Sequence, residues 1–296
     1  MSQLSPSDPF SVSVIIPSHN RLPLLKRAIA SVLEQTYPAL EIIVIDDGSS
    51  DGTDQWLAQK SDSIVSIIQK NHGVSHARNR GIEISSAQWI AFLDSDDYWH
   101  TDKLEKQRAM LLENPSSRFC HCDEIWVRNA KRINPAFKHK KRGGYIYEHC
   151  LPLCAISPSA AVIHRSIFKD HGLFDETLPA CEDYDLWLRI TAREPVSYVD
   201  DSLLTKTGGH DDQLSQRYPI MDRFRLQALA KIIRNGELDN EQHKITTLIL
   251  LKKLSIVIDG AKKHKNLPLL DALRNDYHEW ISLLDYKTEA DNNNTR

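Results

Sequence analysis

Short apolar runs alternate with helical patterns along residues 12–99. The apolar runs are rich in β-branched residues and predict strands at 12–16, 41–45, 64–69 and 89–93. Apolar residues at helical spacing predict helices at 22–35, 53–59 and 74–85. Strands that alternate with helices are typical of βαβ units. We therefore expect an α/β fold with a Rossmann-like, mostly parallel sheet flanked by helices.

The pattern changes in the second part of the chain. Residues 119–209 show irregular strands broken by loops and one clear helix at 182–192. Residues beyond 218 are predicted to be helical, and the last ten have the polar composition of a disordered tail. The predicted organisation is an N-terminal tail at 1–10, an α/β domain at 11–217, a C-terminal helical region at 218–286 and a tail at 287–296.

The C-terminal helices, predicted at 220–234, 240–263 and 267–284, carry apolar stripes beside a few lysines. Such stripes need a partner surface, so we expect these helices to pack onto the α/β domain or onto a second protomer, which would form a homodimer. Docking to an anionic membrane is the weaker alternative, because the basic residues are few.

Composition narrows the partners and the location. The 296 residues carry a net charge of −3, which leaves no electrostatic footprint for nucleic acid. The longest apolar runs fall far short of the ~20 residues of a membrane helix, so any membrane contact is expected to be peripheral. Residues 1–10 lack the features of a signal peptide, and the five cysteines form an odd set. We expect a cytoplasmic protein, with any membrane contact at the inner face.

Polar clusters follow each of the four predicted strands. They are Ser18–Asn20, Asp46–Ser49, Lys70–Gly73 and Asp94–Asp97. Ligands of open parallel sheets bind outside the carboxyl ends of the strands, so we expect one binding crevice at this edge. Asp46 and Asp47 can accept hydrogen bonds from a uracil imide or from ribose, or serve mainly in the turn before the next helix. Lys70 adds a cation suited to phosphate. A basic stretch at 131–144 is expected to be a mobile, solvated loop.

The sequence Asp94-Ser95-Asp96 ends the fourth predicted strand. Two carboxylates one residue apart can share a hard divalent cation, and Mg²⁺ or Mn²⁺ held in this way takes further ligands from substrate phosphates and water. A solvated turn rich in Asp is the plain alternative. The position directly after the buried run WIAFL favours the metal site.

Five segments together resemble the inverting family 2 glycosyltransferases, which have a GT-A fold. They are VSVIIPSHNR, VIDDGSSDGT, NHGVSHARNRG, FLDSDDYW and EDYDLWLR, in the family's order over roughly residues 10–205. The resemblance implies transfer of a sugar from a nucleotide-diphosphate sugar, most often a UDP-sugar, with Mn²⁺ or Mg²⁺. Residues 11–100 would bind the donor, and residues 101–217 would serve the acceptor and catalysis. The acceptor would be a glycan or a lipid-linked sugar in the synthesis of cell-surface polysaccharide or glycoconjugate.

The resemblance also assigns roles at the donor site. Asp47 would contact the uracil with Arg78 nearby, and Pro17 would shape the base pocket. Asp94 would reach ribose or metal, and Asp96 would bind the metal directly. The remaining residues assigned to the nucleotide sugar come from the polar clusters: Asn20, Asp46, Lys70 and Ser95.

The acid pair Glu182-Asp183 opens the predicted helix at 182–192. Inverting transfer needs one carboxylate to take the acceptor proton on the face opposite the diphosphate. The resemblance selects Asp183 as this base and Glu182 as its neighbour, whereas two ordinary acids in a first helical turn are the plain alternative. A looser match adds His210 as a ligand of metal or diphosphate. Acceptor residues are expected between 120 and 180, where Glu124 and Trp126 are weak candidates.

Three other functions fit the pattern less well. A sugar nucleotidyltransferase usually carries a glycine-rich basic loop after its first strand, where this chain has PSHNR. An NAD-dependent oxidoreductase needs G-x-G-x-x-G at that point. A non-catalytic nucleotide-sugar-binding protein of the same fold is disfavoured because every expected carboxylate is present. The cysteine spacings around residues 120–154 do not match a zinc knuckle.

Overall fold

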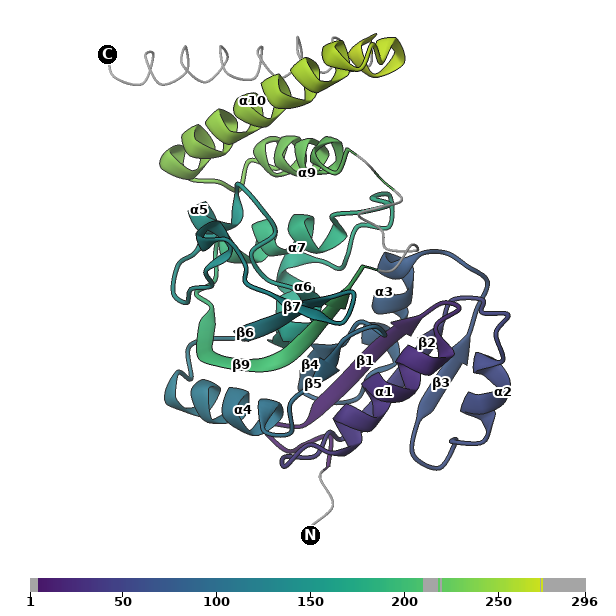
Figure 1. The fold of residues 1–296 in the computed structure, drawn as a ribbon. Coiled ribbons are helices and arrows are strands. Elements are labelled where there is room, and N and C mark those ends of the chain that lie inside the picture. The colour runs from purple at the N-terminus through teal and green to yellow at the C-terminus, as the bar shows by residue number, and fades with distance from the viewer. Residues whose placement is uncertain (1–4, 210–217, 219, 272, 274–296) are drawn as a thin grey trace. The chain divides into compact units, whose positions relative to one another are not determined.

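A computed structural model arranges the four strands of residues 12–92 as parallel neighbours. They are β3 (Val65–Ile68), β2 (Glu41–Asp46), β1 (Val12–Ser18) and β4 (Trp89–Phe92), in that order across the sheet. The crossovers carry α1 (Leu22–Leu33), α2 (Thr53–Ala58) and α3 (Val74–Ile84). β1 is buried along its whole length between its neighbours and the helices, which explains why it is apolar apart from Ser13 and Ser18 (Figure 1). The expected parallel α/β arrangement is confirmed.

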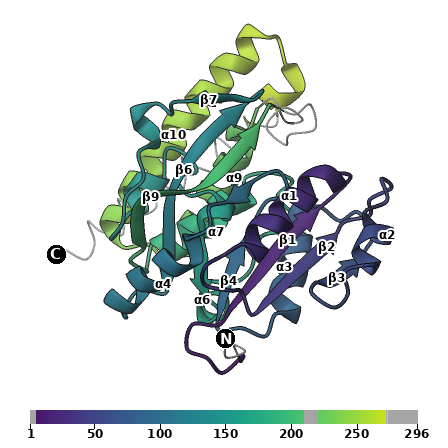
Figure 2. The same ribbon diagram turned by 60° about the horizontal axis from the view of Figure 1, so that its bottom comes forward.

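The second half of the chain extends the same sheet with mixed strands. These strands are β5 (Tyr98–Trp99), β6 (Phe119–Arg128), β7 (Lys131–Ile133), β8 (Val162–His164) and β9 (Ser197–Gly208). β8 is antiparallel to both β4 and β6. β6 runs parallel to β9, and the two strands lie side by side in Figure 2. The register of β6 against β9 shifts between Cys122 and Glu124, and β9 curves strongly. The sheet is therefore fully parallel only in its first half.

Helices and short turns complete this half. They are α4 (Lys103–Glu113), α5 (Tyr147–Cys150), α6 (Ser166–His171), α7 (Glu182–Thr191) and the 3₁₀ turns η1 (Phe137–His139) and η2 (Pro158–Ala160). The sequence pattern did not predict α4. Its buried positions include Lys103 and Gln107, so the helix lacks the clean apolar stripe on which such a prediction depends.

Residues 5–209, 218, 220–271 and 273 are the part of the chain that the structure describes. The chain divides into one unit up to residue 217 and a second from residue 218. In the second unit α9 (Asp222–Arg234) packs on α10 (Asn240–Lys263), and Lys253 Nζ lies 3.0 Å from Asp222 Oδ1. The helix expected at 267–284 falls largely outside the described residues. None of the described helices is long and apolar enough to cross a membrane.

Gly81 lets α3 lie directly on β1. A Cβ atom at this position would come within 2.4 Å of Ile15 Cγ2, so any other residue would push the helix away from the strand. Arg78 is buried on the same helix, one turn before Gly81. Because α3 starts at the carboxyl end of β3, this close approach holds Arg78 near the carboxyl edge of the sheet.

Candidate active site

Hydrogen bonds join the polar loops that follow β1, β2, β3 and β4. Asn20 Oδ1 accepts from a backbone N–H of the loop after β2 at 2.7 Å. Asp47 at the end of β2 accepts from the backbone N–H of Gly73 in the loop after β3 at 2.8 Å. Arg21, after β1, donates from Nη1 to Asp96 Oδ2 at 2.8 Å. The four polar clusters of the sequence therefore meet at one edge of the sheet.

Asp47 is buried and holds the loop after β3 in place. Its Oδ1 accepts from Gln69 Nε2 at 2.8 Å and from the backbone N–H of His72 at 2.9 Å, while its Oδ2 accepts from Gly73. Lys70 lies in this braced loop with an exposed side chain. A uracil contact by Asp47 would use the lone pairs that these three hydrogen bonds leave on its oxygens.

Two buried oxygen atoms beside Asp47 lack a partner among the described residues. Asp46 Oδ2 and Ser18 Oγ lie at positions that β2 and β1 pair in register. Asp46 Oδ1 accepts from the backbone N–H of Ser49 at 3.0 Å, which closes the turn. Pro17, next to Ser18, is buried in β1. Because unpaired buried oxygens are costly, the pair favours a hydrogen-bonding ligand at this end of the strands.

Asp94 and Asp96 flank the buried Ser95 directly after β4. Arg78 Nη2 lies 2.7 Å from Asp94 Oδ1, and Arg21 Nη1 lies 2.8 Å from Asp96 Oδ2. The pKa of the Asp96 carboxyl is nevertheless raised, first by burial and then by the charge of Asp94. Because the charge of Asp94 opposes the ionisation of Asp96, the two carboxylates form an oxygen pair that a divalent cation stabilises. The residues present therefore fit Mg²⁺ or Mn²⁺.

Asp97, the next residue, is a buried carboxylate that the sequence did not single out. Its Oδ2 accepts from Ser159 Oγ at 2.7 Å, and its Oδ1 accepts from the backbone N–H of Thr207 at 2.9 Å. Burial and the charges of Asp96 and Asp94 raise the pKa of Asp97 well above its ordinary value. Asp97 therefore fastens the turn after β4 to η2 and to β9.

Arg78 connects the turn after β4 with the start of α7. It donates to Glu182 Oε1 at 2.6 Å and to Asp94 Oδ1 at 2.7 Å, and its side chain is 3% exposed. Burial alone would lower the pKa of Arg78, but the two carboxylates raise it above its ordinary value. The pKa of Glu182 is raised by burial, against the effect of Arg78. The hydrogen bonds of Arg78 thus go to these two acids.

Cys181 starts α7 with an unusual backbone conformation. Its φ is +62°, a left-handed value that costs a residue other than glycine on the order of 1 kcal/mol. After this turn Glu182 extends to Arg78, whereas Asp183 lines a cavity. Asp183 Oδ1 accepts from the backbone N–H of Tyr184 at 2.7 Å. Its Oδ2 accepts from the thiol of Cys154 at 3.1 Å.

The cavity beside Asp183 has a volume of about 140 Å³. Glu124 and Trp126 of β6, the two weak acceptor candidates, lie in its wall together with Asp183. The other lining residues are Asp123, Pro135, His139, Lys141, Cys154, Ala155, Ile156, Ser157 and Lys206. The structure thus brings three predicted residues, from two separate regions of the sequence, to one cavity.

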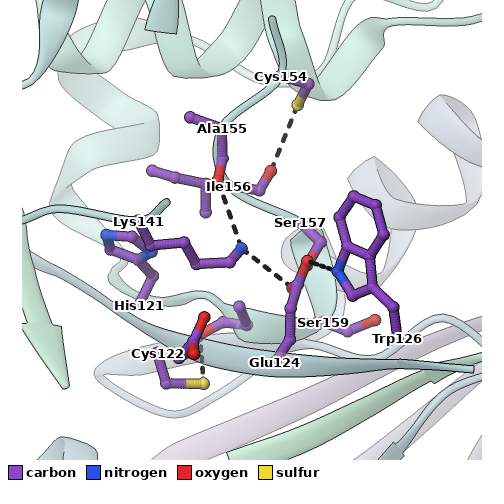
Figure 3. A network of polar contacts seen from close by, with 12 residues as sticks. His121, Cys122, Glu124, Trp126, Lys141, Cys154, Ala155, Ile156, Ser157 and Ser159 are labelled. Carbon is purple, nitrogen blue, oxygen red and sulfur yellow. Dashed lines mark hydrogen bonds and ion pairs between the residues drawn. The ribbon is translucent and has the colours of Figure 1, made fainter. Parts of the chain in front are cut away.

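Glu124 is held by three donors (Figure 3). Its Oε1 accepts from Trp126 Nε1 at 2.7 Å, and its Oε2 accepts from Ser157 Oγ and lies 3.0 Å from Lys141 Nζ. Burial would raise the pKa of Glu124, but Lys141 and its other partners lower it to about 2. Lys141 belongs to the basic stretch that was expected to be solvated. That prediction is wrong for Lys141, because its ammonium group is buried against Glu124.

Lys206 of β9 is the cavity cation that sequence reasoning missed. Burial alone would lower its pKa, but Glu124, Asp97 and Asp94 outweigh burial and raise it above the ordinary value. Its ammonium group makes no hydrogen bond or ion pair with any residue that the structure describes. A lysine directly after the buried run Leu203–Thr205 was the available signal in the sequence. Lys206 therefore offers a positive charge to a ligand between the turn after β4 and Asp183.

Of the three metal ligands predicted from the sequence, Asp94 and Asp96 lie in the described part of the chain. His210 lies outside the described residues. Within them, no group of three or more His, Cys, Asp and Glu side chains could hold a metal ion. Asp94 and Asp96 would therefore share a cation with donor phosphates and water, as Mg²⁺ commonly does.

Comparison with known proteins identifies the family. The model described as Glycosyl transferase family 2 matches residues 13–172. The Escherichia coli enzyme UDP-Glc:alpha-D-GlcNAc-diphosphoundecaprenol beta-1,3-glucosyltransferase WfgD is 30% identical over 259 residues, which cover 87% of this chain and 96% of WfgD. An uncharacterized glycosyltransferase of Rickettsia conorii is 32% identical over 65% of this chain, which spans only 32% of that relative's length.

Solved structures show the same fold. Staphylococcus aureus TarS 1–349 in complex with UDP-GlcNAc has a TM-score of 0.66 at 21% identity, over 82% of this chain and 71% of that one. The mannosyltransferase PcManGT from Pyrobaculum calidifontis, in complex with GDP-Man and Mn²⁺, has a TM-score of 0.58 at 18% identity, over 94% and 86%. The family match and the likeness to WfgD show that this chain is a glycosyltransferase and belongs to glycosyltransferase family 2.

Proposed function

We propose that this chain transfers a sugar, with inversion, from a UDP-sugar to a hydroxyl group of a lipid-diphosphate-linked sugar during cell-surface polysaccharide synthesis. The position of Asp183 carries the proposal. Its carboxylate faces the cavity with Glu124 and Trp126, while its chain neighbour Glu182 is tied through Arg78 to Asp94. The two ion pairs of Arg78 thus fix the start of α7, where the proposed base lies, relative to the proposed diphosphate site. A fixed distance between base and leaving group suits a direct displacement at the anomeric carbon.

The donor would lie along the carboxyl edge of β1, β2 and β4. The unpaired oxygens of Asp46 and Ser18 suit the N–H groups of a base, with Pro17 beside them. Asp94 and Asp96 would hold Mn²⁺ or Mg²⁺, which supplies charge neutralisation for the departing diphosphate. Lys206 adds a fixed positive charge on the side of the cavity. UDP is favoured over other nucleotides because WfgD, which matches this chain over most of its length, is named for a UDP-sugar.

Asp183 would act as the general base. The acceptor oxygen forms a bond to the anomeric carbon, its proton passes to the Asp183 carboxylate, and the bond from that carbon to the diphosphate breaks. The N–H of Tyr184 and the thiol of Cys154 each hold one oxygen of Asp183, which fixes the carboxylate without removing its charge. A thiol is a weak donor, so the oxygen that accepts it retains basicity toward a hydroxyl group.

The acceptor would occupy the cavity beside Trp126. The ring centroids of Trp126 and His139 are 5.0 Å apart, and an indole face is a common contact for a sugar ring. The printed acceptor of WfgD is a sugar linked to diphosphoundecaprenol. We therefore assign this chain an acceptor of the same class, a sugar carried by a lipid diphosphate.

The test begins with the donor. UDP-, GDP- and dTDP-sugars are compared for Mn²⁺-dependent thermal stabilisation of the protein, and the stabilising donor is then incubated with a short-chain lipid-diphosphate sugar. We expect stabilisation by UDP-sugars and a product whose new linkage is inverted by NMR. Stabilisation by nucleoside triphosphates with release of pyrophosphate would contradict the proposal, as would retention of configuration.

A further inference from the structure

Residues 128–142 form a segment with many unpaired positive charges, here called the basic segment. It runs from the end of β6 through β7 and η1 and contains no Asp or Glu. Its exposed cations are Arg128, Lys131, Arg132, Lys138, Lys140 and Arg142. None of these six makes an ion pair within the described ranges of the chain. The net charge of the whole chain is −3, so this positive charge is a local concentration.

Exposed aromatic side chains accompany these cations. Phe137 in η1 is 82% exposed, and Tyr145, just past the basic segment, is 81% exposed. A single exposed aromatic residue needs no explanation. Two of them beside six unpaired cations match the composition of surfaces that bind anionic bilayers, where cations meet the lipid phosphates and aromatic rings enter the headgroup region.

The inward side of the basic segment belongs to the cavity of Asp183. Pro135, His139 and Lys141 line that cavity, whereas Lys138 and Lys140 are exposed. The ion pair of Lys141 with Glu124 anchors the segment, because both side chains are 4% exposed. One stretch of chain thus forms a wall of the cavity and presents charges to the outside.

We propose that the basic segment and Tyr145 bind the surface of a membrane rich in anionic phospholipid, with Phe137 in the headgroup region. This docking brings the cavity of Asp183 to the membrane surface, where a lipid-linked acceptor carries its sugar. The inference deepens the proposed function and rests on it for the reason why docking is useful. Nucleic acid could also attract cations and aromatic rings. The basic segment, however, lines the cavity proposed for a lipid-linked acceptor, and this favours the lipid surface.

Sedimentation of the full chain with vesicles tests the proposal. The vesicles contain phosphatidylcholine alone or phosphatidylcholine with phosphatidylglycerol. The test variant carries Lys131→Glu, Arg132→Glu and Lys138→Glu, none of which lines the cavity, and a second variant carries Phe137→Ser. The matched control carries the same change of charge in α10: Lys252→Glu, Lys262→Glu and Lys263→Glu. Each variant is also assayed for transfer to a water-soluble acceptor.

We expect binding to the anionic vesicles only, with release at high salt. A basic residue near an anionic surface contributes about fivefold in partitioning, so the triple variant should lose more than a hundredfold in affinity. Phe137→Ser should weaken binding severalfold. The α10 control keeps the basic segment, so it should bind nearly as well as the parent protein. Transfer to the soluble acceptor should stay normal in all three variants.

Several outcomes would overturn this docking surface and leave the transferase proposal standing. They are equal binding to both vesicle types, no binding to either, loss of binding in the α10 control alone, or tighter binding to an oligonucleotide than to vesicles. Failure of transfer by the parent protein, with vesicle binding as expected, would instead reject the proposed function and keep the docking surface.

Discussion

Arg78 and Glu182 form a buried ion pair in which Nη1 lies 2.6 Å from Oε1, although 104 positions separate them in the chain. The pair decides between the two acids at the start of α7. Glu182 is turned to Arg78, so Asp183 is the member of the pair that lines the cavity. The acid that binds Arg78 and the candidate base are therefore neighbours in the sequence. Replacing each acid in turn by its amide should separate the two roles.

Asp183→Asn should lower the rate of transfer by two or more orders of magnitude while donor affinity stays near normal. General base assistance contributes roughly 10² to 10⁴ and acts on the acceptor hydroxyl alone. The measurement is kcat with a working acceptor, together with UDP titration of parent and variant. Normal turnover by Asp183→Asn would remove Asp183 from the mechanism.

Glu182→Gln should act mainly on stability. Arg78 keeps Asp94 as a partner but loses one buried carboxylate, and a hydrogen bond to a charged group is worth about 1.5 to 3 kcal/mol. We expect a lower unfolding free energy in urea and a milder loss of kcat than for Asp183→Asn. If Glu182→Gln is the inactive enzyme at unchanged stability, the roles of the two acids must be exchanged.

Asp96→Asn should abolish most of the metal-dependent affinity for UDP and leave the fold intact. One charge is removed from a site with few protein ligands, and the side chain lies in the turn after β4 and not in the apolar core. Isothermal titration with UDP, in the presence of Mn²⁺ and of EDTA, measures the effect. A variant that binds UDP with Mn²⁺ as the parent does would show that Asp96 is not a metal ligand.

Lys206→Met and Lys70→Met compare two candidate phosphate contacts. Lys206 adjoins the acidic groups of the cavity and has a raised pKa, whereas Lys70 is exposed in the loop after β3. We expect Lys206→Met to lower kcat/KM for the donor at least tenfold, since it removes a charge that a departing diphosphate would meet in a partly dry site. Lys70→Met should have the smaller effect. The reverse order in steady-state kinetics would restore Lys70 as the main phosphate contact.

Lys103 provides a test by pH away from the active site. Burial lowers the pKa of Lys103 from 10.5 to about 8, and its Nζ donates to Gln107 Oε1 at 2.6 Å. Below pH 8 both states are protonated and the folded state bears the full cost of the buried charge, about 3 kcal/mol. Between pH 8 and 10.5 the unfolded chain holds a proton that the folded chain lacks, so the contribution of Lys103 to stability rises with pH.

Lys103→Met removes this titration. The unfolding free energy of the variant minus that of the parent should therefore fall by about 3 kcal/mol from neutral pH to pH 10.5, as measured by urea unfolding at several pH values. The buried thiols of Cys120 and Cys122 are common to both proteins. A difference that does not change with pH would mean that Lys103 keeps an ordinary pKa in the folded protein.

Local pattern was enough to predict the first half of the sheet. A strand such as β1, buried along its whole length, is apolar at most positions, and the helices between such strands show their own period. The polar clusters could be located as well, because carboxyl ends of parallel strands share one edge. The motifs that resemble the family could also be recognised from the sequence, because each consists of residues that are close together in the chain. The roles of the site residues and of His210, and the packing of the C-terminal helices, stay predictions.

Only the tertiary structure decided which charged side chains are buried and with whom. Glu124 meets Lys141 from a stretch that was expected to be solvated, Arg78 meets Glu182, and α4, which the sequence pattern did not predict, buries Lys103. A buried charge is tolerated when a partner or a polar neighbour compensates its desolvation, and that neighbour comes from another element. Hydrophobic periodicity reports the surroundings of apolar residues along one element, whereas the fate of a charge depends on contacts across the fold. For that reason the sequence by itself determined the first half of the sheet, the edge where the polar clusters meet and the family, and the folded chain determined the cavity and the ion pairs around Asp183.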